Sequence, residues 1–458
     1  MEEKQLNILM YPWIAMGHIT PYFHLANKLT EKGHKVTLLL PNKAKLQLQS
    51  LNHYYSSLLT LHTITIPHVD PLPPGTETAS DVPFPLHNHL ATAFDLTRPQ
   101  FESIVSTLQP NLVFYDMAHW VPEVVSPGTK YVAYFVVSTA ALAFGMVPSR
   151  DPPKDKAVVE EDDCVVNVPH RYPSSKVVLE PRRLLGLYMP LGQGLTLYDR
   201  VTTAVKRSHV IAVRTCQETE GKYCDYLSSQ YDNKPILFSG PVLPELEIEG
   251  ELEGHWAKWL NQFRPNSVVY CSFGSQFVLE VVQFQELLLG FEMTNLPFLV
   301  AVKPPTGCIT VEEAFPEGFA ERTKERGVVT GEWVQQRLIL NHPSVGCFVS
   351  HCGFGSMWES LMSENQIVLI PQLEDQVLNT KIMVEELKVA VEVDKGEDGS
   401  WVSKESFCNA IKCVTDEGSE ICGLIKKNHV LWRQKLGDPK FMSGYIDKFI
   451  KELQGLVD

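Results

Sequence analysis

Apolar residues along the chain fall into short runs separated by stretches with helical periodicity. The segment LNILMYPW (6–13) is followed by PYFHLANKLTEKGH, whose apolar residues have helical spacing, and then by KVTLLLP. This succession predicts a β-α-β unit with parallel strands. Further apolar runs at 112–116, 131–137 and 209–215 are separated by stretches long enough for crossover helices. The first part of the chain is therefore predicted to be a doubly wound α/β domain.

A second series of strands and helices follows residue 254. Its strand candidates are SVVYCSFGS, PFLVAVKP, GVVTGEWV, GCFVSHCG and QIVLIPQ. Between the two series lies PVLPELEIEGELEG (241–254), which is rich in Pro, Glu and Gly and has no apolar periodicity, as is typical of a surface linker. We therefore predict an α/β chain of two Rossmann-like domains facing across a cleft, at 1–240 and 255–435, with a C-terminal helix at 436–458 that packs back on the first domain.

Two segments need separate interpretation. Residues 63–85 and 151–173 are rich in Pro and turn residues and are predicted to be long loops. These loops either shape a binding cleft or are mobile surface loops without a role in binding. Residues 131–147 carry no charge and approach the length of a membrane span. We favour a buried strand followed by a buried helix, because Ser138 and Thr139 lie where the turn would fall and no basic flank fixes an orientation. We expect no stable membrane insertion.

Composition and charge narrow the classes of partner. The 458 residues are enough for two domains, and 44% of them are hydrophobic, which suffices for two cores. A formal net charge of −14 argues against nucleic acid, since phosphate binding needs clustered Lys and Arg. The ten cysteines show neither CxxC nor zinc-ligand spacing, and the N-terminus does not resemble a signal peptide. A cytoplasmic protein with reduced thiols and a small-molecule partner is expected.

The segment HCGFGS (351–356) lies between an apolar run and a helical stretch. Its backbone N–H groups would open a helix and could cradle a diphosphate. His351 and Ser356 add side-chain donors, while Gly353 and Gly355 allow a close backbone approach. Taken alone, the segment could equally be an ordinary glycine-containing turn.

The wider window Trp333 to Gln376 resembles the signature box of plant family 1 UDP-glycosyltransferases. The resemblance rests on the opening Trp, the Gln at the fourth position, NHPSVG, HCG, a Glu six residues after that Gly, and the closing DQ. It implies that Trp333 stacks on uracil, that Gln336 and Glu359 bind the ribose, and that Asp375 with Gln376 holds the donor sugar. Further donor-binding residues are expected at Ser275 and Ser138. As isolated residues, Glu359 and Asp375 could be surface acids of helices.

The window departs from the family pattern at one place. Most members carry Trp-Asn where this chain has Phe354-Gly355, so one side-chain contact near the phosphates and the sugar is missing. The Phe-Gly form, with GHITPYFHLANKLTEKGH and DQVLNTKIMVEELKVAVEV, resembles the branch that elongates anthocyanidin and flavonoid 3-O-glycosides. The donor implied by this resemblance is UDP-glucose, UDP-rhamnose or UDP-xylose.

His18 and Asp116 are the candidate catalytic pair. His18 falls after the first predicted strand and Asp116 ends LVFYD, so a parallel sheet brings them to one edge. A neutral imidazole can take the proton of an acceptor hydroxyl, and the carboxylate can orient it. The family places its catalytic His and Asp in these contexts. Alternatively, His18 satisfies a helix N-terminus and Asp116 caps a neighbouring helix.

The resemblance implies the GT-B arrangement and an inverting transfer without cofactor or metal. The first domain would bind the acceptor and the second UDP-sugar, with the helix N-terminus, His351 and Ser356 stabilising the leaving diphosphate. We expect a monomer that acts on a flavonoid or anthocyanidin 3-O-glucoside. Alternatives are a transferase for another phenolic or terpenoid glycoside or aglycone, a UDP-sugar epimerase or hydrolase, and a non-catalytic UDP-sugar-binding protein.

Overall fold

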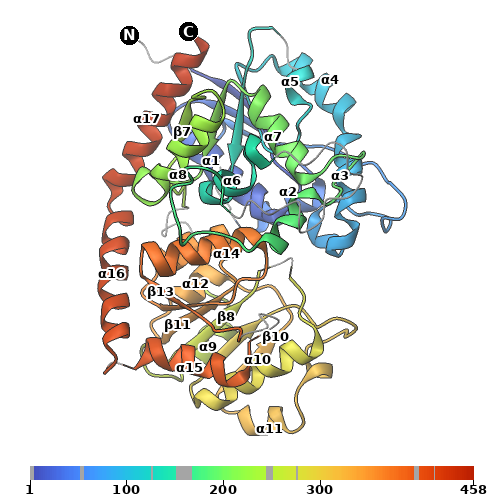
Figure 1. Cartoon of the computed structure of the whole chain (residues 1–458). Coiled ribbons are helices and arrows are strands. Elements are labelled where there is room, and N and C mark those ends of the chain that lie inside the picture. The colour runs from blue at the N-terminus through green and yellow to red at the C-terminus, as the bar shows by residue number, and fades with distance from the viewer. Residues whose placement is uncertain are drawn as a thin grey trace. The chain divides into compact units, whose positions relative to one another are not determined.

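Each half of the chain builds its own parallel sheet, covered on both faces by helices (Figure 1). The computed structural model describes residues 5–51, 56–124, 127–150, 168–243, 251–274, 277–396, 402–416 and 418–458. Contacts divide the chain into two units, which are 1–248 with 439–458 (unit 1) and 249–438 (unit 2). The predicted class, two Rossmann-like α/β domains, is confirmed.

The sheet of unit 1 has the strand order β3-β2-β1-β4-β5-β6-β7, and every pairing is parallel. Its strands are β1 (Asn7–Tyr11), β2 (Lys35–Leu40), β3 (Leu59–Thr63), β4 (Leu112–Tyr115), β5 (Lys130–Phe135), β6 (Val210–Val213) and β7 (Ile236–Phe238). The order reverses between β1 and β4, where Tyr11 pairs with Tyr115. The carboxyl ends of β1 and β4 therefore meet at the switch point of the sheet, where open α/β sheets bind ligands.

Helices cover both faces of this sheet. They are α1 (Met16–Glu31), α2 (Asn42–Leu51), α3 (His87–Asp95), α4 (Arg98–Leu108), α5 (Val121–Val124), α6 (Thr139–Gly145), α7 (Leu197–Arg207), α8 (Gln217–Gln230) and α17 (Pro439–Val457). Alternate strand residues face opposite sides, so Ile8 and Met10 join a core with α1, α2 and α17. Tyr11 instead packs on Phe94 of α3 and Phe101 of α4.

The uncharged segment 131–147 is a buried strand followed by a buried helix, as predicted. It comprises most of β5 and all of α6, whose residues are almost completely buried. Within the part of the chain that is described, no helix combines the length and apolarity needed to cross a membrane.

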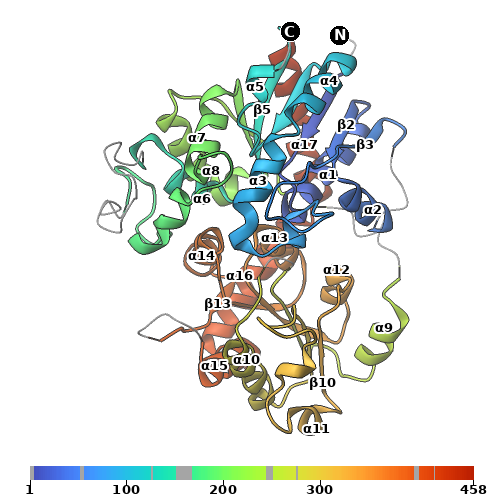
Figure 2. The ribbon, with the colours of Figure 1, turned by 90° about the vertical axis from the view of Figure 1, so that its right-hand side faces the viewer.

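The sheet of unit 2 has the order β10-β9-β8-β11-β12-β13, again parallel throughout. Its strands are β8 (Val268–Ser272), β9 (Phe298–Ala301), β10 (Gly327–Thr330), β11 (Val345–Ser350), β12 (Gln366–Leu369) and β13 (Ala390–Glu392). Its helices are α9 (Gly254–Leu260), α10 (Val281–Thr294), α11 (Phe319–Thr323), α12 (Gln336–Leu340), α13 (Phe354–Met362), α14 (Glu374–Lys381), α15 (Lys404–Thr415) and α16 (Glu420–Leu436). Figure 2 shows α10 and α15 side by side on one face. A Cβ at Gly290 of α10 would lie 2.5 Å from Phe407 of α15, so this contact requires glycine.

Some elements differ from the prediction. Helix α1 begins at Met16 rather than Pro21, because Ala15 O already accepts hydrogen bonds from the N–H groups of His18 and Ile19. His18 therefore lies in the first turn of a helix and not in the preceding loop. The sequence also missed three strands, β3, β7 and β13. Residues 244–250 of the predicted linker and 151–167 of the predicted second loop lie outside the described residues.

Candidate active site

His18 and Asp116 form a direct pair at the switch point of unit 1. His18 Nδ1 lies 2.6 Å from Asp116 Oδ2, and the two side chains are 23% and 1% exposed. The other carboxylate oxygen, Oδ1, accepts hydrogen bonds from the backbone N–H groups of Trp13 at 2.8 Å and Met117 at 2.5 Å. Neither donor belongs to a helix, so Asp116 orients the imidazole instead of capping a helix, and it is itself held by the backbone.

This pair has the geometry of a general base. With Nδ1 donating to the carboxylate, the neutral imidazole keeps Nε2 as its acceptor nitrogen. The partial exposure of His18 leaves the ring open to a ligand, whereas the carboxylate behind it is buried. An acceptor hydroxyl within hydrogen-bonding distance of Nε2 could be deprotonated as it attacks.

Ser138 does not join this pair. Its side chain is fully buried and caps α6, accepting a hydrogen bond from Ala141 N at 3.4 Å. Thr139 is also buried, and Glu220 Oε1 accepts from Ala140 N at 2.9 Å. In this structure the Ser138 hydroxyl serves the helix terminus.

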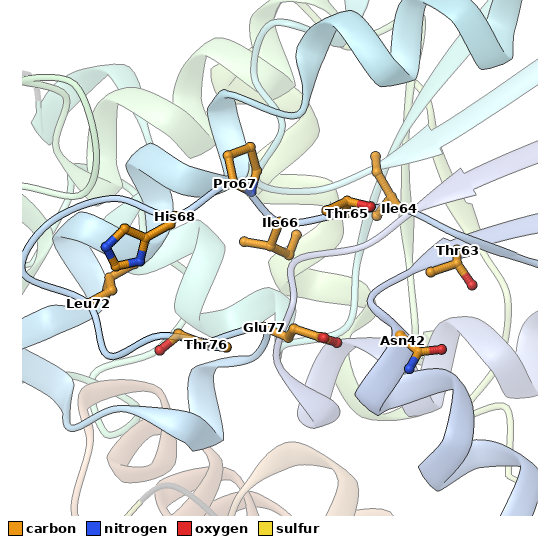
Figure 3. Close-up of a pocket in the computed structure, with 11 residues that line it drawn as sticks. Asn42, Thr63, Ile64, Thr65, Ile66, Pro67, His68, Leu72, Thr76 and Glu77 are labelled. Atoms are coloured by element: carbon orange, nitrogen blue, oxygen red, sulfur yellow. The ribbon is translucent and has the colours of Figure 1, made fainter.

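A cavity of about 140 Å³ lies at the carboxyl ends of β2 and β3. Figure 3 shows Ile66 and Glu77 on facing segments. Its polar lining consists of Asn42, Thr63, Thr65, His68, Thr76 and Glu77. The same loop continues to Ala79, whose N–H donates to Ile14 O at 2.9 Å. Two strand spacings, about 10 Å, separate β3 from β1. The cavity and the His18–Asp116 pair therefore both lie at the carboxyl ends of the strands of unit 1.

In unit 2, three residues of the predicted donor site come together. Gln336 Nε2 lies 2.7 Å from Glu359 Oε2 and 3.3 Å from Ser356 Oγ. Tyr270 Oη donates to Gln336 Oε1 at 3.4 Å. Trp333, three residues before Gln336, is 58% exposed and can offer a ring face to a ligand.

The HCGFGS segment is a turn from strand to helix, as predicted. Strand β11 ends at Ser350, Gly353 is the N-cap and α13 begins at Phe354. A Cβ at Gly353 would lie 2.6 Å from His351 Nε2, so the ring requires a glycine there. Burial lowers the pKa of His351 to about 4. His351 is therefore neutral at physiological pH and can act on an anion as a hydrogen-bond donor, not as a cation.

Phe354 and Gly355 occupy the first turn of α13. The Phe354 ring is 5% exposed and packs against Trp358 in a T-shaped contact with centroids 5.7 Å apart. Phe354 thus contributes to the core, and Gly355, which has no side chain, leaves its position on the helix open.

Asp375 and Gln376 lie in the first turn of α14. Gln376 is 6% exposed, and its Oε1 accepts hydrogen bonds from Gln372 N at 2.9 Å and Leu373 N at 3.1 Å. Its amide oxygen is therefore used within the fold, which leaves Nε2 as the atom that can meet a ligand. Ser275 lies outside the described residues. Among the residues that are described, no cluster of three or more His, Cys, Asp or Glu side chains could hold a metal ion.

The fold matches that of solved sugar transferases. The structure of Arabidopsis thaliana UGT89C1 complexed with UDP-L-rhamnose superimposes with a TM-score of 0.75, at 20% identity, covering 99% of both chains. The two Rossmann-like sheets, with this likeness, show the GT-B fold.

Sequence comparison then gives the family. The model for UDP-glucoronosyl and UDP-glucosyl transferases matches residues 241–428. The chain is 54% identical over 461 residues to UDP-glucosyl transferase 79T1 of Saponaria officinalis, covering 100% of both chains. It is 53% identical over 465 residues to anthocyanidin 3-O-glucoside 2'''-O-xylosyltransferase of Arabidopsis thaliana, covering 100% of this chain and 98% of that one. The chain belongs to the plant family 1 UDP-glycosyltransferases, enzymes that use a UDP-sugar as co-substrate.

Proposed function

We propose that this enzyme adds a sugar to a sugar hydroxyl of a small-molecule glycoside, in particular a flavonoid or anthocyanidin 3-O-glucoside. The observation that carries the proposal is the 53% identity, over the whole chain, to a transferase whose acceptor is an anthocyanidin 3-O-glucoside. The donor sugar is glucose, rhamnose or xylose. The enzyme acts as a monomer in the cytoplasm, a reducing compartment in which its nine described cysteines, all free thiols, are stable.

Unit 2 binds the donor. The exposed Trp333 stacks on uracil, and the Gln336–Glu359 pair binds the ribose hydroxyls. The N–H groups that open α13, with His351 and Ser356, hold the diphosphate. Asp375 and the Nε2 amide group of Gln376 bind the transferred sugar. Glycine at 355 leaves room beside the sugar and the phosphates, and Ser275 is a further candidate for a donor contact. Ser138, which was also expected to contact the donor, is fully buried and caps α6, so it is not part of this proposal.

Unit 1 binds the acceptor and supplies the base. His18 Nε2 takes the proton of the acceptor hydroxyl while the oxygen attacks the anomeric carbon of the donor. The bond from that carbon to the diphosphate breaks, UDP leaves, and the configuration inverts. Asp116, 2.6 Å from Nδ1, stabilises the imidazolium that forms. Negative charge that develops on the diphosphate is stabilised by the α13 N-terminus and by neutral donors, without a metal ion.

The cavity at β2 and β3 supports a hydroxylated acceptor. Its lining carries three threonine hydroxyl groups, an imidazole, an amide and a carboxylate. Such groups match the alternating donors and acceptors of a sugar or a polyphenol ring. With the reacting hydroxyl at His18, a part of the acceptor about 10 Å away along the sheet edge would reach this cavity.

The proposal is tested with a matrix of donors and acceptors analysed by mass spectrometry. Purified enzyme is incubated with UDP-glucose, UDP-rhamnose or UDP-xylose and with a flavonol 3-O-glucoside, an anthocyanidin 3-O-glucoside, their aglycones or a terpenoid glycoside. We expect a diglycoside from a flavonoid 3-O-glucoside with one of the donors. Transfer only to aglycones or only to the terpenoid glycoside would contradict the proposed acceptor. Conversion of the donor without any acceptor would indicate an epimerase or hydrolase, and UDP-sugar binding without turnover would indicate a regulator.

A further inference from the structure

A buried ion pair lies beneath the turn that follows Asp116. Arg200, on α7, donates through Nη1 and Nη2 to the two carboxylate oxygens of Asp95, the last residue of α3. The two side chains are 0% and 4% exposed. Protein stability alone does not account for a buried ion pair, because apolar residues of similar size often stabilise a protein as well or better.

The guanidinium also binds two backbone carbonyl groups. Arg200 Nε donates to Leu191 O, and Nη1 donates to Met117 O at 3.3 Å. Asp95 Oδ1 also accepts from Trp120 Nε1 at 3.0 Å. The pair thus joins α3, α7, the segment before α7 and the turn 116–120. Of the side chains, only arginine offers donors in a rigid fork to so many acceptors at once.

The surrounding backbone is shaped for this side chain. Gly192 has a φ of +80°, and a Cβ there would lie 2.2 Å from Arg200 Nη2 and 2.9 Å from the carbonyl carbon of Ala91. Gly192 N donates to Asn88 Oδ1 at 2.7 Å, which fixes the segment against α3. No larger residue fits between the guanidinium and α3.

The backbone of Met117 connects Arg200 to the proposed catalytic carboxylate. Its carbonyl oxygen accepts from Arg200, and its N–H donates to Asp116 Oδ1 at 2.5 Å. Trp120, held by Asp95, packs edge-on against Phe101 with centroids 5.3 Å apart. The turn that carries Asp116 is therefore anchored to the Arg200–Asp95 pair at two points, Met117 and Trp120.

We propose that Arg200, paired with Asp95, is a positioning residue that acts through the backbone of Met117 to hold the Asp116 carboxylate against His18. This inference rests on the proposed catalytic role of His18 and Asp116. Arg200 touches neither residue and takes no part in proton transfer. It holds the carbonyl group of Met117, in the 117–118 peptide, while the N–H of Met117, in the preceding 116–117 peptide, donates to Oδ1. Holding Met117 in place limits where Oδ1 lies, and because Oδ1 and Oδ2 belong to one planar group, it limits the direction of Oδ2 toward the imidazole as well.

The test uses Arg200→Lys in the full chain. Lysine keeps the charge opposite Asp95 but lacks the fork that reaches both carbonyl oxygens. We expect kcat to fall about 10- to 100-fold, KM for the UDP-sugar to stay within about twofold, and the Met117 amide to exchange with deuterium at least tenfold faster. Arg207→Lys is the matched control, because Arg207 lies on the same helix in an exposed pair with Glu123 and should leave all three quantities unchanged.

A double-mutant cycle separates positioning from general destabilisation. If Arg200 acts through Asp116, Arg200→Lys causes no further loss in an Asp116→Asn background. Losses that multiply, an unchanged kcat, or unchanged Met117 exchange would each overturn the proposal. Asp95→Leu/Arg200→Met, which removes both charges without leaving one unpaired, covers the case in which the lysine variant fails to fold, and it should reproduce the kcat loss. If the wild-type enzyme does not elongate glycosides, only the proposed acceptor is refuted. The role of Arg200 can still be tested with any acceptor that the enzyme does use, and by the amide exchange of Met117.

Discussion

The imidazole of His18 lies 2.6 Å from the carboxylate of Asp116, although 98 positions separate the two residues in sequence. Asp116→Asn keeps the shape of the side chain but offers an N–H or a neutral oxygen to the ring. We expect kcat to fall about 10³- to 10⁴-fold, as when the orienting carboxylate of a catalytic triad is replaced. Isothermal titration should show unchanged UDP affinity, since UDP binding is assigned to unit 2.

The matched control for this pair is His255→Gln. His255 also lies near a carboxylate, 3.7 Å from Glu253, but its side chain is 61% exposed and it belongs to unit 2. This variant should transfer sugar at the wild-type rate. If Asp116→Asn stayed within tenfold of wild type, the pair would not be the base of the reaction.

The contact between Gln336 and Glu359 predicts a ribose site that depends on the carboxylate. Glu359→Ala removes the acceptor that lies 2.7 Å from Gln336 Nε2. Loss of one charge-assisted hydrogen bond costs about 1.5–3 kcal/mol, so UDP should bind about 10- to 100-fold more weakly. Glu321→Ala, an exposed substitution on α11, serves as the control. Equal affinities of the two variants for UDP would show that Glu359 does not contact the nucleotide.

Burial of His351 predicts a pH dependence of stability. Its pKa is lowered from 6.5 to about 4 by burial, so the folded chain stays neutral there while the unfolded chain takes up a proton below pH 6.5. The free energy of unfolding should therefore fall as the pH drops from 6.5 to about 4, by roughly 2–3 kcal/mol from this residue. Denaturant titrations of ligand-free wild type and His351→Gln across this range measure the difference. Parallel curves for the two proteins would contradict the assignment.

The cavity at β2 and β3 predicts a site that discriminates among acceptors. Thr65→Val removes one hydroxyl from its lining at nearly constant volume. The KM for a flavonoid 3-O-glucoside should rise about 3- to 10-fold with kcat unchanged, the range expected for one hydrogen bond. Thr60→Val lies on the same edge strand but outside the lining and is the control. An equal effect of both variants would place the acceptor elsewhere.

The strands that carry the active site could be predicted because they are buried on both faces. Runs such as LVFY and VGCFVS are then almost continuously apolar. The missed strands β3 (LTLHT) and β13 (AVE) are short edge strands with partly exposed residues, so their sequences resemble loops. Parallel strands were enough to place the residues that follow β1 and β4 at the same end of the sheet, whereas the pairing of β1 with β4 was not predicted.

Contacts between side chains that are far apart in the sequence were harder to predict. His18 and Asp116 could be paired because each follows a strand and parallel strands end at one edge. Arg200 and Asp95 lie on two helices, 105 positions apart, and in the sequence they resemble ordinary surface charges. Their pairing becomes visible only in the folded structure. Gln376 was expected to hold the donor sugar with Asp375, but the sequence did not show that two backbone N–H groups just before α14 already use its amide oxygen.

Helix α17 returns to unit 1 after the chain has completed unit 2. Ile446, Phe449, Ile450 and Leu453 belong to the same core as β1 and α1, and Tyr445 Oη donates to Glu218 of α8 at 2.6 Å. During synthesis on the ribosome, the core of unit 1 is therefore filled only after residues 439–458 have emerged. Unit 2 (249–438) is complete before α17 is synthesised. A premature stop codon just before α17 would therefore leave the core of unit 1 unfilled, although unit 1 is synthesised first, and would leave unit 2 complete.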